Sequence, residues 1–298
     1  MRILLLGKNG QLGSELQRLL PPLGQLTSLA RNDLDLRDVS ALQSVLRALK
    51  PDVILNAAAY TAVDRAESEP DQAFQVNALA PGIMAKTARD LGAAFIHYST
   101  DYVFDGRKGA PYIEDDPPAP LNVYGNSKLD GEKRIQQAGG AFLILRTSWV
   151  YSLRGNSFVN KVLEWAHQEE TLRIVNDQIG NPTWSRELAN ITFQLLRQNQ
   201  AEIRDLIRER RGIYHLAGNG FVSRYEWARQ ILIHASRRTG ESIPPIEPVA
   251  TDAFPAPARR PSFSALDCSK FRQTFRLSLP DWSASLRVAM MEGTTTGI

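Results

Sequence analysis

A tyrosine and a lysine four residues apart, Tyr124 and Lys128, are the first residues in this sequence whose spacing suggests chemistry. On a helix this spacing places both side chains on one face, one turn apart. A free phenol has a pKa of about 10, and a neighbouring ammonium favours its ionised form. One unit charge about 4 Å away supplies roughly 4 kcal/mol at an effective dielectric near 20, which corresponds to about 3 pKa units. A correctly placed Lys128 is therefore predicted to make Tyr124 a proton donor and acceptor near neutral pH.

Thr100 is the third candidate, because it ends an apolar run that is typical of a strand, Ala94-Phe95-Ile96 followed by Tyr98. Its hydroxyl is expected to polarise a carbonyl group that Tyr124 protonates. A tyrosine and a lysine at this spacing often occur by chance. The interpretation therefore depends on the elements that surround them.

A glycine-rich loop follows the first predicted strand. The run Ile3-Leu4-Leu5-Leu6 is typical of a parallel strand buried on both faces. Gly7, Gly10 and Gly13 follow at three-residue spacing, and a helix is predicted from about Leu12 to Leu20. Such glycines let the backbone turn tightly and approach a pyrophosphate at the helix N-terminus. A glycine turn without a ligand is the alternative.

Strands and helices alternate along the first half of the chain. This order predicts an α/β fold with a doubly wound, mostly parallel sheet over residues 1–150. Residues 151–298 are predicted to form a smaller C-terminal substrate-binding lobe, interleaved with the sheet. The later strands of the sheet are expected at about 25–29, 53–55, 94–100 and 142–146, and its later helices at about 40–50, 70–91 and 124–138. In the lobe, helices are expected at 157–169, 185–198, 223–238 and 283–292, and strands at 172–175, 213–216 and 246–249.

Composition restricts the class of protein. The chain has 298 residues, 43% of them hydrophobic, and a net charge of +3 with both signs interspersed. No basic stripe indicates nucleic-acid binding, and no apolar run is long enough to span a membrane. The single cysteine, Cys268, excludes an internal disulfide and fits a reducing cytosol, and the four histidines have no metal-ligand spacing. We therefore expect a cytoplasmic protein that acts on a small molecule and binds neither nucleic acid nor membranes.

Several motifs stand in a characteristic order: the glycine loop, Asn56-Ala57-Ala58-Ala59, Ser99-Thr100-Asp101-Tyr102-Val103-Phe104 and Tyr124-x-x-x-Lys128. Together they resemble the extended short-chain dehydrogenase/reductases and, more narrowly, the dTDP-4-dehydrorhamnose reductase family. The resemblance covers essentially the whole chain, and it implies a Rossmann sheet and reduction of a 4-keto nucleotide sugar by NADPH or NADH. Further matching segments are Asp64–Glu67, Pro120–Gly125, Arg146–Tyr151, Asn176–Gln178 and Ala258–Pro261.

The resemblance also implies roles for individual residues. Tyr124 protonates the new C4 hydroxyl, Lys128 lowers the phenol pKa and holds the nicotinamide ribose, and Thr100 hydrogen-bonds the reacting oxygen. Asp101 and Trp149 contact the deoxysugar. The cofactor is expected to contact the glycine loop, the strand ends and the catalytic pair: Gly7, Gly10, Gln11, Leu12, Gly13, Asp35, Leu36, Ala59, Tyr60, Thr61, Tyr98, Tyr124 and Lys128.

The end of the second strand predicts the cofactor preference. An acid at this place binds the ribose 2′-hydroxyl of NAD, and it would repel the 2′-phosphate of NADP. Here the strand ends at Ala30-Arg31, and Arg31 is able to pair with a phosphate. Asp33 or Asp35 could still take the part of the acid. We expect NADPH to be used at least as well as NADH.

Three glutamates far apart in the sequence, Glu15, Glu187 and Glu292, match positions that hold a magnesium ion at a homodimer interface in some reductases of the family. Carboxylates and waters in octahedral geometry are the ligands that Mg²⁺ prefers. Three solvated surface carboxylates are the alternative. The resemblance thus implies a homodimer bridged by Mg²⁺.

Other functions remain open. A nucleotide-sugar epimerase on the same fold is not excluded by these motifs, whereas dehydratases that resemble this fold carry Asp-Glu where this chain has Asp101-Tyr102. The chain also resembles the non-catalytic regulatory subunit of methionine adenosyltransferase, although the Thr100, Tyr124 and Lys128 set favours the reductase. Arg259-Arg260 is either a diphosphate-binding pair or a pair of surface arginines. His97, inside a strand, is interpreted as a packed residue rather than a base.

Overall fold

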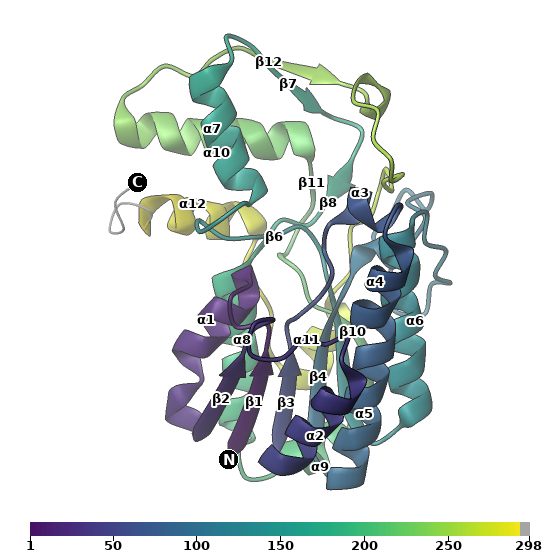
Figure 1. Ribbon diagram of the computed structural model, residues 1–298. Coiled ribbons are helices and arrows are strands. Elements are labelled where there is room, and N and C mark those ends of the chain that lie inside the picture. Colours follow the sequence, from purple (N-terminus) through teal and green to yellow (C-terminus); the bar gives the residue numbers. More distant parts are fainter. Residues whose placement is uncertain (293–298) are drawn as a thin grey trace.

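The computed structural model describes residues 1–292, and its centre is a sheet of six parallel strands. The strand order is β10-β5-β4-β3-β1-β2, so β2 and β3 lie on either side of β1 and the direction of winding reverses there (Figure 1). This is the doubly wound arrangement that the sequence predicts. The strands are β1 (Arg2–Leu6), β2 (Gln25–Leu29), β3 (Val53–Asn56), β4 (Ala94–Thr100), β5 (Ala141–Thr147) and β10 (Gly212–His215).

Both faces of the sheet are buried, and successive side chains of a strand enter different cores. In β1, Ile3 and Leu5 belong to one hydrophobic core, whereas Leu4 and Leu6 belong to the other. Alternation between two apolar faces explains why the strands appear in the sequence as continuous apolar runs.

Helices cover both faces of the sheet (Figure 1). One face packs against α1 (Gln11–Leu19), α8 (Ser185–Gln198), α9 (Ile203–Glu209) and α11 (Ser269–Phe275). The other packs against α2 (Val39–Leu49), α5 (Ala80–Leu91) and α6 (Val123–Ala138). Helices α9 and α11 were not predicted from the sequence, because seven residues are too few for a clear helical period.

The helix predicted at 70–91 contains a π-helical turn. It consists of α4 (Pro70–Phe74), the π turn Gln75–Leu79, and α5. The Asn77 side chain in this turn accepts a hydrogen bond from the Tyr60 amide and donates to the Tyr60 carbonyl and the Ser127 hydroxyl. Turns of this kind are frequent at functional sites. Here the turn joins the loop after β3 to helix α6.

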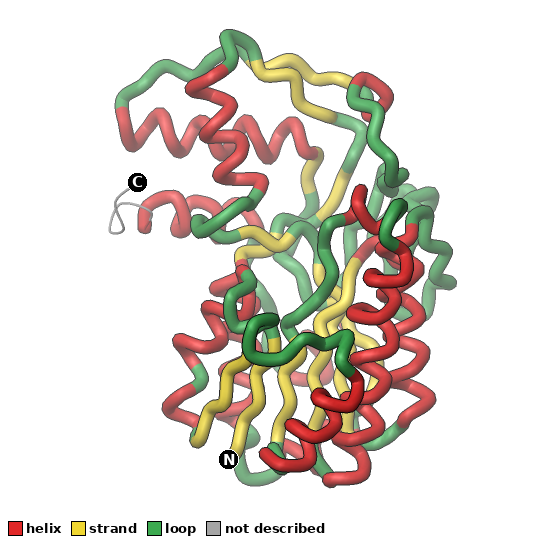
Figure 2. The backbone as a smooth tube through the Cα atoms, viewed as in Figure 1, coloured by secondary structure: helices red, strands yellow, loops and turns green. Residues whose placement is uncertain are grey.

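A smaller lobe lies beyond the carboxyl ends of the sheet strands (Figure 2). Its core includes Tyr151, Trp184 and Trp227. Four of its strands have two residues each and were not predicted, since such short segments show no periodic pattern. Its elements are β6 (Val150–Tyr151), α7 (Phe158–Gln168), β7 (Leu172–Val175), β8 (Ile179–Gly180), β9 (Thr183–Trp184), β11 (Val222–Ser223), α10 (Arg224–Thr239), β12 (Ile246–Val249) and α12 (Trp282–Glu292).

The chain passes repeatedly between the sheet and the lobe. After residue 150 it returns to the sheet as α8, α9, β10 and α11. Residues 258–260 also lie against the first half of the chain. There, Asp64 in α3 (Val63–Ala66) pairs with Arg260, and the Asn122 side chain donates a hydrogen bond to the Arg259 carbonyl. The remaining short helical turns are Pro21–Leu23, Asp101–Val103 and Thr251–Ala253. Within residues 1–292, no helix combines the length and the hydropathy that a membrane span requires.

Candidate active site

The loop between β1 and α1 has the shape that a dinucleotide-binding turn requires. Gly7 has a φ of +87°, and a Cβ atom there would lie 2.7 Å from the Ala58 nitrogen. A Cβ atom on Gly13 would lie 2.0 Å from the Gly7 carbonyl oxygen, so α1 packs directly on the loop backbone. Gly10 is the N-cap residue of α1, and no side chain caps this helix. Its first amide groups are therefore available to a phosphate.

Gln11 gives a second observation that fits a dinucleotide. Its Oε1 atom is buried and has no hydrogen-bond partner among the described residues. A buried acceptor without a donor costs about 1–3 kcal/mol, and a ligand at the helix N-terminus can supply the missing donor. The adjacent Leu12 is buried in the core under the loop. The residues present thus fit a bound dinucleotide.

Two carboxylates that follow β2 are paired with cations. Asp33 pairs with Lys8 at 2.8 Å, and Asp35 pairs with Arg37 at 2.6 Å. The Arg37 guanidinium lowers the pKa of Asp35 to about 2, so this carboxylate is ionised and neutralised by its neighbour. Arg31 is exposed and forms a salt bridge with neither carboxylate.

The loop after β3 borders the glycine loop, because Gly7 lies against Ala58. Ala59 and Tyr60 are half-buried in it and Thr61 is exposed. The Tyr60 hydroxyl donates to Glu69 at 2.6 Å. This hydrogen bond ties the loop to the residue that directly precedes α4. Leu36 is buried in the adjacent core.

Lys128 is directed toward the end of β4. Its Nζ atom donates to the Tyr98 carbonyl at 2.7 Å and lies 3.1 Å from His97 Nε2. Burial lowers the pKa of Lys128 to about 8, while the nearby Glu132 carboxylate acts in the opposite direction. His97 is fully buried as expected, but its contact with Lys128 was not predicted. Burial, and then the Lys128 charge, hold the pKa of His97 well below its ordinary value, so the imidazole is neutral.

The expected pKa of Tyr124 is corrected by the structure. The spacing predicts that Lys128 lowers it, but burial instead raises the pKa of Tyr124 well above its ordinary value. Lys128 does not offset this effect, because its Nζ atom turns to His97 and Tyr98. A hydrogen bond with Thr100 acts to lower the Tyr124 pKa and is the weaker influence. Tyr124 is thus protonated at neutral pH, the form that donates a proton.

Tyr98 and Asp101 have surroundings that the sequence did not indicate. The Tyr98 ring belongs to the core of the sheet, and its hydroxyl bonds to Thr192 at 2.8 Å. Only its backbone is therefore placed for the predicted cofactor contact. The Asp101 carboxylate is 2% exposed and accepts hydrogen bonds from the hydroxyls of Thr100, Ser148 and Ser264. It joins three segments of the chain, and its contact with the deoxysugar stays a prediction.

Trp149 lies between the site and the core of the lobe. Its φ of +44° is in the left-handed region, which costs a non-glycine residue about 1 kcal/mol. Such strain is frequent at functional sites. The ring stacks on Trp227, with 5.6 Å between ring centroids, and the Arg224 guanidinium lies 3.7 Å from the Trp149 centroid.

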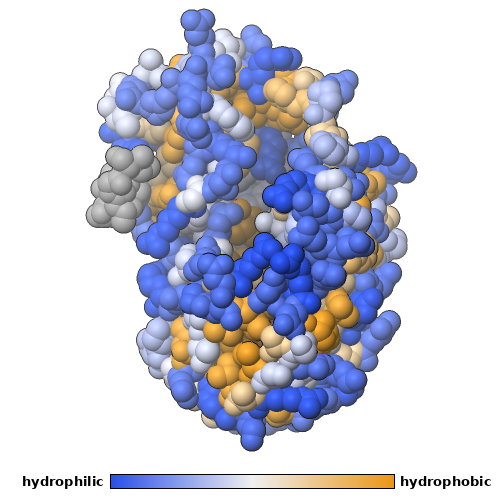
Figure 3. Space-filling view, in the orientation of Figure 1, coloured by the Kyte–Doolittle hydropathy of each residue, from blue (hydrophilic) through white to orange (hydrophobic). Residues whose placement is uncertain are grey.

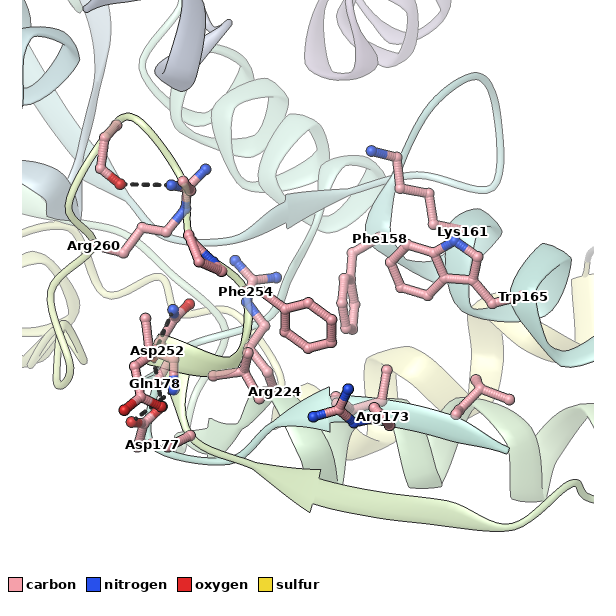
Figure 4. A pocket seen from close by; sticks show the side chains of 18 of the residues that line it. Phe158, Lys161, Trp165, Arg173, Asp177, Gln178, Arg224, Asp252, Phe254 and Arg260 are labelled. Atoms are coloured by element: carbon pink, nitrogen blue, oxygen red, sulfur yellow. Dashed lines mark hydrogen bonds between the residues drawn. The ribbon is translucent and has the colours of Figure 1, made fainter. Parts of the chain in front are cut away.

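A cavity of about 1330 Å³ lies in the lobe, and it was not predicted from the sequence. The surface is hollowed between the sheet and the lobe (Figure 3). Segments between residues 156 and 260 line the cavity, so no local motif reveals it, and Arg259-Arg260 was the one signal in the sequence. Its aromatic and positively charged residues are Phe158, Trp165, Phe254, Lys161, Arg173, Arg224, Arg259 and Arg260, and Figure 4 labels all of them but Arg259.

Glu15, Glu187 and Glu292 do not form a metal site within one chain. Glu15 pairs with Arg18 at 2.9 Å and lies 3.5 Å from Arg186, which also pairs with Glu292. An arginine therefore supplies the positive charge between two of the three carboxylates. In the described part of the chain, no group of three or more histidine, cysteine, aspartate or glutamate side chains is arranged to hold a metal ion.

Comparison with known proteins distinguishes the functions that the motifs left open. Residues 1–294 match the family model described as RmlD substrate binding domain. The chain is 42% identical over 304 residues to the dTDP-4-dehydrorhamnose reductase of Escherichia coli (strain K12), with 99% of each chain covered. It is 44% identical over 287 residues to the enzyme of that name from Burkholderia thailandensis, with 95% of each chain covered. This chain belongs to the dTDP-4-dehydrorhamnose reductase family.

Solved structures agree with membership of the dTDP-4-dehydrorhamnose reductase family. The crystal structure of a family member from Bacillus anthracis, in complex with NADP, matches with a TM-score of 0.88 and 33% identity over 98% of this chain and 99% of the other. A UDP-glucose 4-epimerase from Thermus thermophilus matches with a TM-score of 0.77 but only 19% identity, which shows a shared fold alone. The epimerase and regulatory-subunit alternatives are therefore not favoured, and the predicted resemblance is confirmed.

Proposed function

We propose that this protein reduces the C4 keto group of dTDP-4-dehydro-L-rhamnose to a hydroxyl group, giving dTDP-L-rhamnose, with NADPH as cofactor. The observation that carries the proposal is the 42% identity, over essentially the full length, to a reductase with this name. The position of Tyr124, Lys128 and Thr100 supports it, because β4 and α6 bring all three to the carboxyl end of the sheet.

Bound NADPH would supply the hydride for C4, and side chains of this protein would supply the proton for the C4 oxygen. Tyr124 donates its hydroxyl proton to the C4 oxygen, and its raised pKa keeps that proton in place beforehand. The Thr100 hydroxyl, next to Tyr124, hydrogen-bonds the same oxygen. The Lys128 ammonium, which donates a hydrogen bond to the Tyr98 carbonyl at the end of β4, is proposed to hold the nicotinamide ribose.

The glycine loop and the end of β2 are proposed to hold the cofactor. The first amides of α1 would donate to the pyrophosphate, and a hydroxyl or amide group of the cofactor would supply the donor that Gln11 Oε1 lacks. Arg31 pairs with a 2′-phosphate, since Lys8 and Arg37 already neutralise Asp33 and Asp35. The relative from Bacillus anthracis was solved with NADP. We therefore expect NADPH to be used at least as well as NADH.

The nucleotide portion of the substrate is proposed to occupy the cavity of the lobe. Phe158, Trp165 and Phe254 offer ring faces on which a base can stack (Figure 4). Asp101 and Trp149 remain the proposed contacts of the deoxysugar, between the cavity and Tyr124.

A homodimer in the cytoplasm is the proposed working form. We assign Mg²⁺ no site within one chain, because Arg186 already pairs with Glu15 and Glu292. A metal bridge would therefore have to involve a second chain.

The proposal is tested with purified protein, dTDP-4-dehydro-L-rhamnose and either NADPH or NADH, by following cofactor absorbance and identifying the product chromatographically. We expect stoichiometric oxidation of NADPH and formation of dTDP-L-rhamnose. An isomerised sugar without net cofactor oxidation would identify an epimerase. Binding of both compounds without any reaction would identify a non-catalytic protein. A strong preference for NADH would contradict the role of Arg31.

A further inference from the structure

The positive side chains of the lobe cavity differ in how their charge is balanced. Lys161, Arg173 and Arg259 are exposed, so water screens them. The Arg260 guanidinium forms hydrogen bonds of 2.9 and 2.6 Å with the two carboxylate oxygens of Asp64. Its charge is therefore already balanced within the chain. Arg224 is the remaining cation of the cavity.

Arg224 is half-buried and lies among aromatic rings. Its guanidinium is 3.7 Å from the centroid of Trp149, 4.9 Å from that of Phe158 and 5.6 Å from that of Trp227. No carboxylate within residues 1–292 lies at salt-bridge distance from it. Burial lowers the pKa of Arg224, yet an arginine remains charged in proteins. The buried Asp101 carboxylate attracts this charge without forming a salt bridge, and aromatic faces compensate desolvation only in part, so a further anion is favoured at this position.

The position of Arg224 fits the middle of a nucleotide sugar. It begins α10 and lies beside Trp149, which follows β5. It also interacts electrostatically with Tyr102, whose ring packs edge-on against that of Tyr124 at 5.8 Å. On its other side the cavity continues toward the rings of Phe158 and Phe254 (Figure 4). A substrate with its C4 atom at Tyr124 and its base among those rings places its diphosphate next to Arg224.

We propose that Arg224 binds the diphosphate of the nucleotide sugar and makes the cavity selective for nucleoside diphosphates over monophosphates. The proposal rests on the proposed function, since it assumes a nucleotide-sugar substrate. A guanidinium suits this role because it donates two parallel hydrogen bonds to phosphate oxygens. It also remains stacked on an aromatic ring while doing so, so binding of the diphosphate would hold Trp149 in place.

The test compares the binding of dTDP, dTMP and thymidine to the full-length protein and to Arg224→Met, Arg224→Lys and Arg229→Met. Arg229 lies on the same helix, is exposed, pairs with Glu226 and lies outside the cavity lining, so it is the matched control. We expect Arg224→Met to weaken dTDP binding about 10- to 100-fold, the range of a charge-assisted hydrogen bond. Thymidine binding should stay unchanged, and Arg224→Lys should recover only part of the loss. Arg229→Met should bind all three compounds normally.

Two results would overturn the proposal. An unchanged ratio of dTDP to dTMP affinity in Arg224→Met would show that Arg224 does not select the diphosphate over the monophosphate. An equal loss for dTDP and thymidine, in a variant with a normal unfolding temperature, would show that Arg224 only supports the cavity wall. Turnover by the unmodified protein is measured separately. Its absence would refute the proposed function without affecting these binding ratios.

Discussion

At the scale of single residues, removing the hydroxyl of Tyr124 should impair the chemical step without impairing cofactor binding. We expect Tyr124→Phe to lower kcat by about 10²- to 10⁴-fold, because only the transferable proton is lost. The affinity for NADPH should change little. Steady-state kinetics and NADPH titration by fluorescence measure the two effects. A variant that keeps a large fraction of the normal rate would exclude Tyr124 as the acid.

The pH dependence of the reduction should reflect the loss of a proton from the Lys128 ammonium. Its pKa in the folded protein is about 8, below its ordinary value of 10.5, so its ammonium is lost at a lower pH than in free lysine. As the pH rises through about 8, the ammonium that is proposed to hold the nicotinamide ribose disappears, so kcat/KM for NADPH should fall. The profile is measured from pH 6 to 10, with protein stability checked at each pH. In Lys128→Met this descending limb should be absent and the remaining rate low throughout. A normal profile in that variant would assign the limb to another group.

The sequence predicted the residue types of the site better than their contacts. The glycine loop and the positions of Tyr124, Lys128 and Thr100 follow from short patterns, because each pattern lies within one element or one turn. The contact of Lys128 with His97 joins α6 to β4. The surroundings of Arg224 likewise depend on Trp149 and Phe158 from other parts of the chain. Such contacts are set by packing between elements, which no local spacing encodes.

At the scale of elements, a buried ion pair fixes helix α6 on the sheet. Glu132, one turn beyond Lys128, pairs with Arg146 of β5 at 2.7 Å and accepts a hydrogen bond from Ser99 of β4. Removing one partner leaves an uncompensated buried charge, so we expect Glu132→Gln to destabilise the protein by about 3–5 kcal/mol. Asp130→Asn is the matched control on the same helix. Its exposed pair with Arg134 should contribute less than about 1 kcal/mol.

Urea unfolding of both variants measures this difference. Equal, small losses would mean that the Glu132–Arg146 pair does not hold the helix. Since α6 also carries Tyr124 and Lys128, a loose helix should reduce kcat in Glu132→Gln even where the protein remains folded.

Element prediction succeeded where segments were long and periodic. The helix expected at 185–198 is α8, Ser185–Gln198, and the strand expected at 246–249 is β12, Ile246–Val249. Segments such as β8, which has two residues, gave no signal because they are defined by their partner strand. The π turn at Gln75–Leu79 was also missed, since its helical pattern is almost that of a continuous helix.

At the scale of the whole molecule, residues 1–150 should not fold as an independent unit. The core under α1 is completed by Leu188, Leu195 and other residues of α8, and β5 pairs with β10. We expect the fragment 1–150 to lack a cooperative unfolding transition and to bind a hydrophobic dye. The full-length chain is the control. A sharp thermal transition in the fragment would contradict this expectation.

The proposed homodimer is tested by sedimentation with and without EDTA. Because Arg186 already pairs with Glu15 and Glu292, we expect a dimer that EDTA leaves intact. Dissociation by EDTA, reversed by added Mg²⁺, would show a metal bridge between two chains. A monomer under both conditions would refute the dimer.

The place of β10 beside β5 also has a consequence for synthesis on the ribosome. Leu143–Arg146 of β5 pair with Gly212–His215, and the intervening residues are translated between the two strands. During that interval the nascent chain presents the edge of β5 with unpaired amide and carbonyl groups, which invite pairing with another chain. The sheet is therefore complete only after Gly212–His215 have been translated, and these residues follow the first part of the lobe. Translation speed across residues 148–211 should then influence how much of the protein aggregates while it is being made.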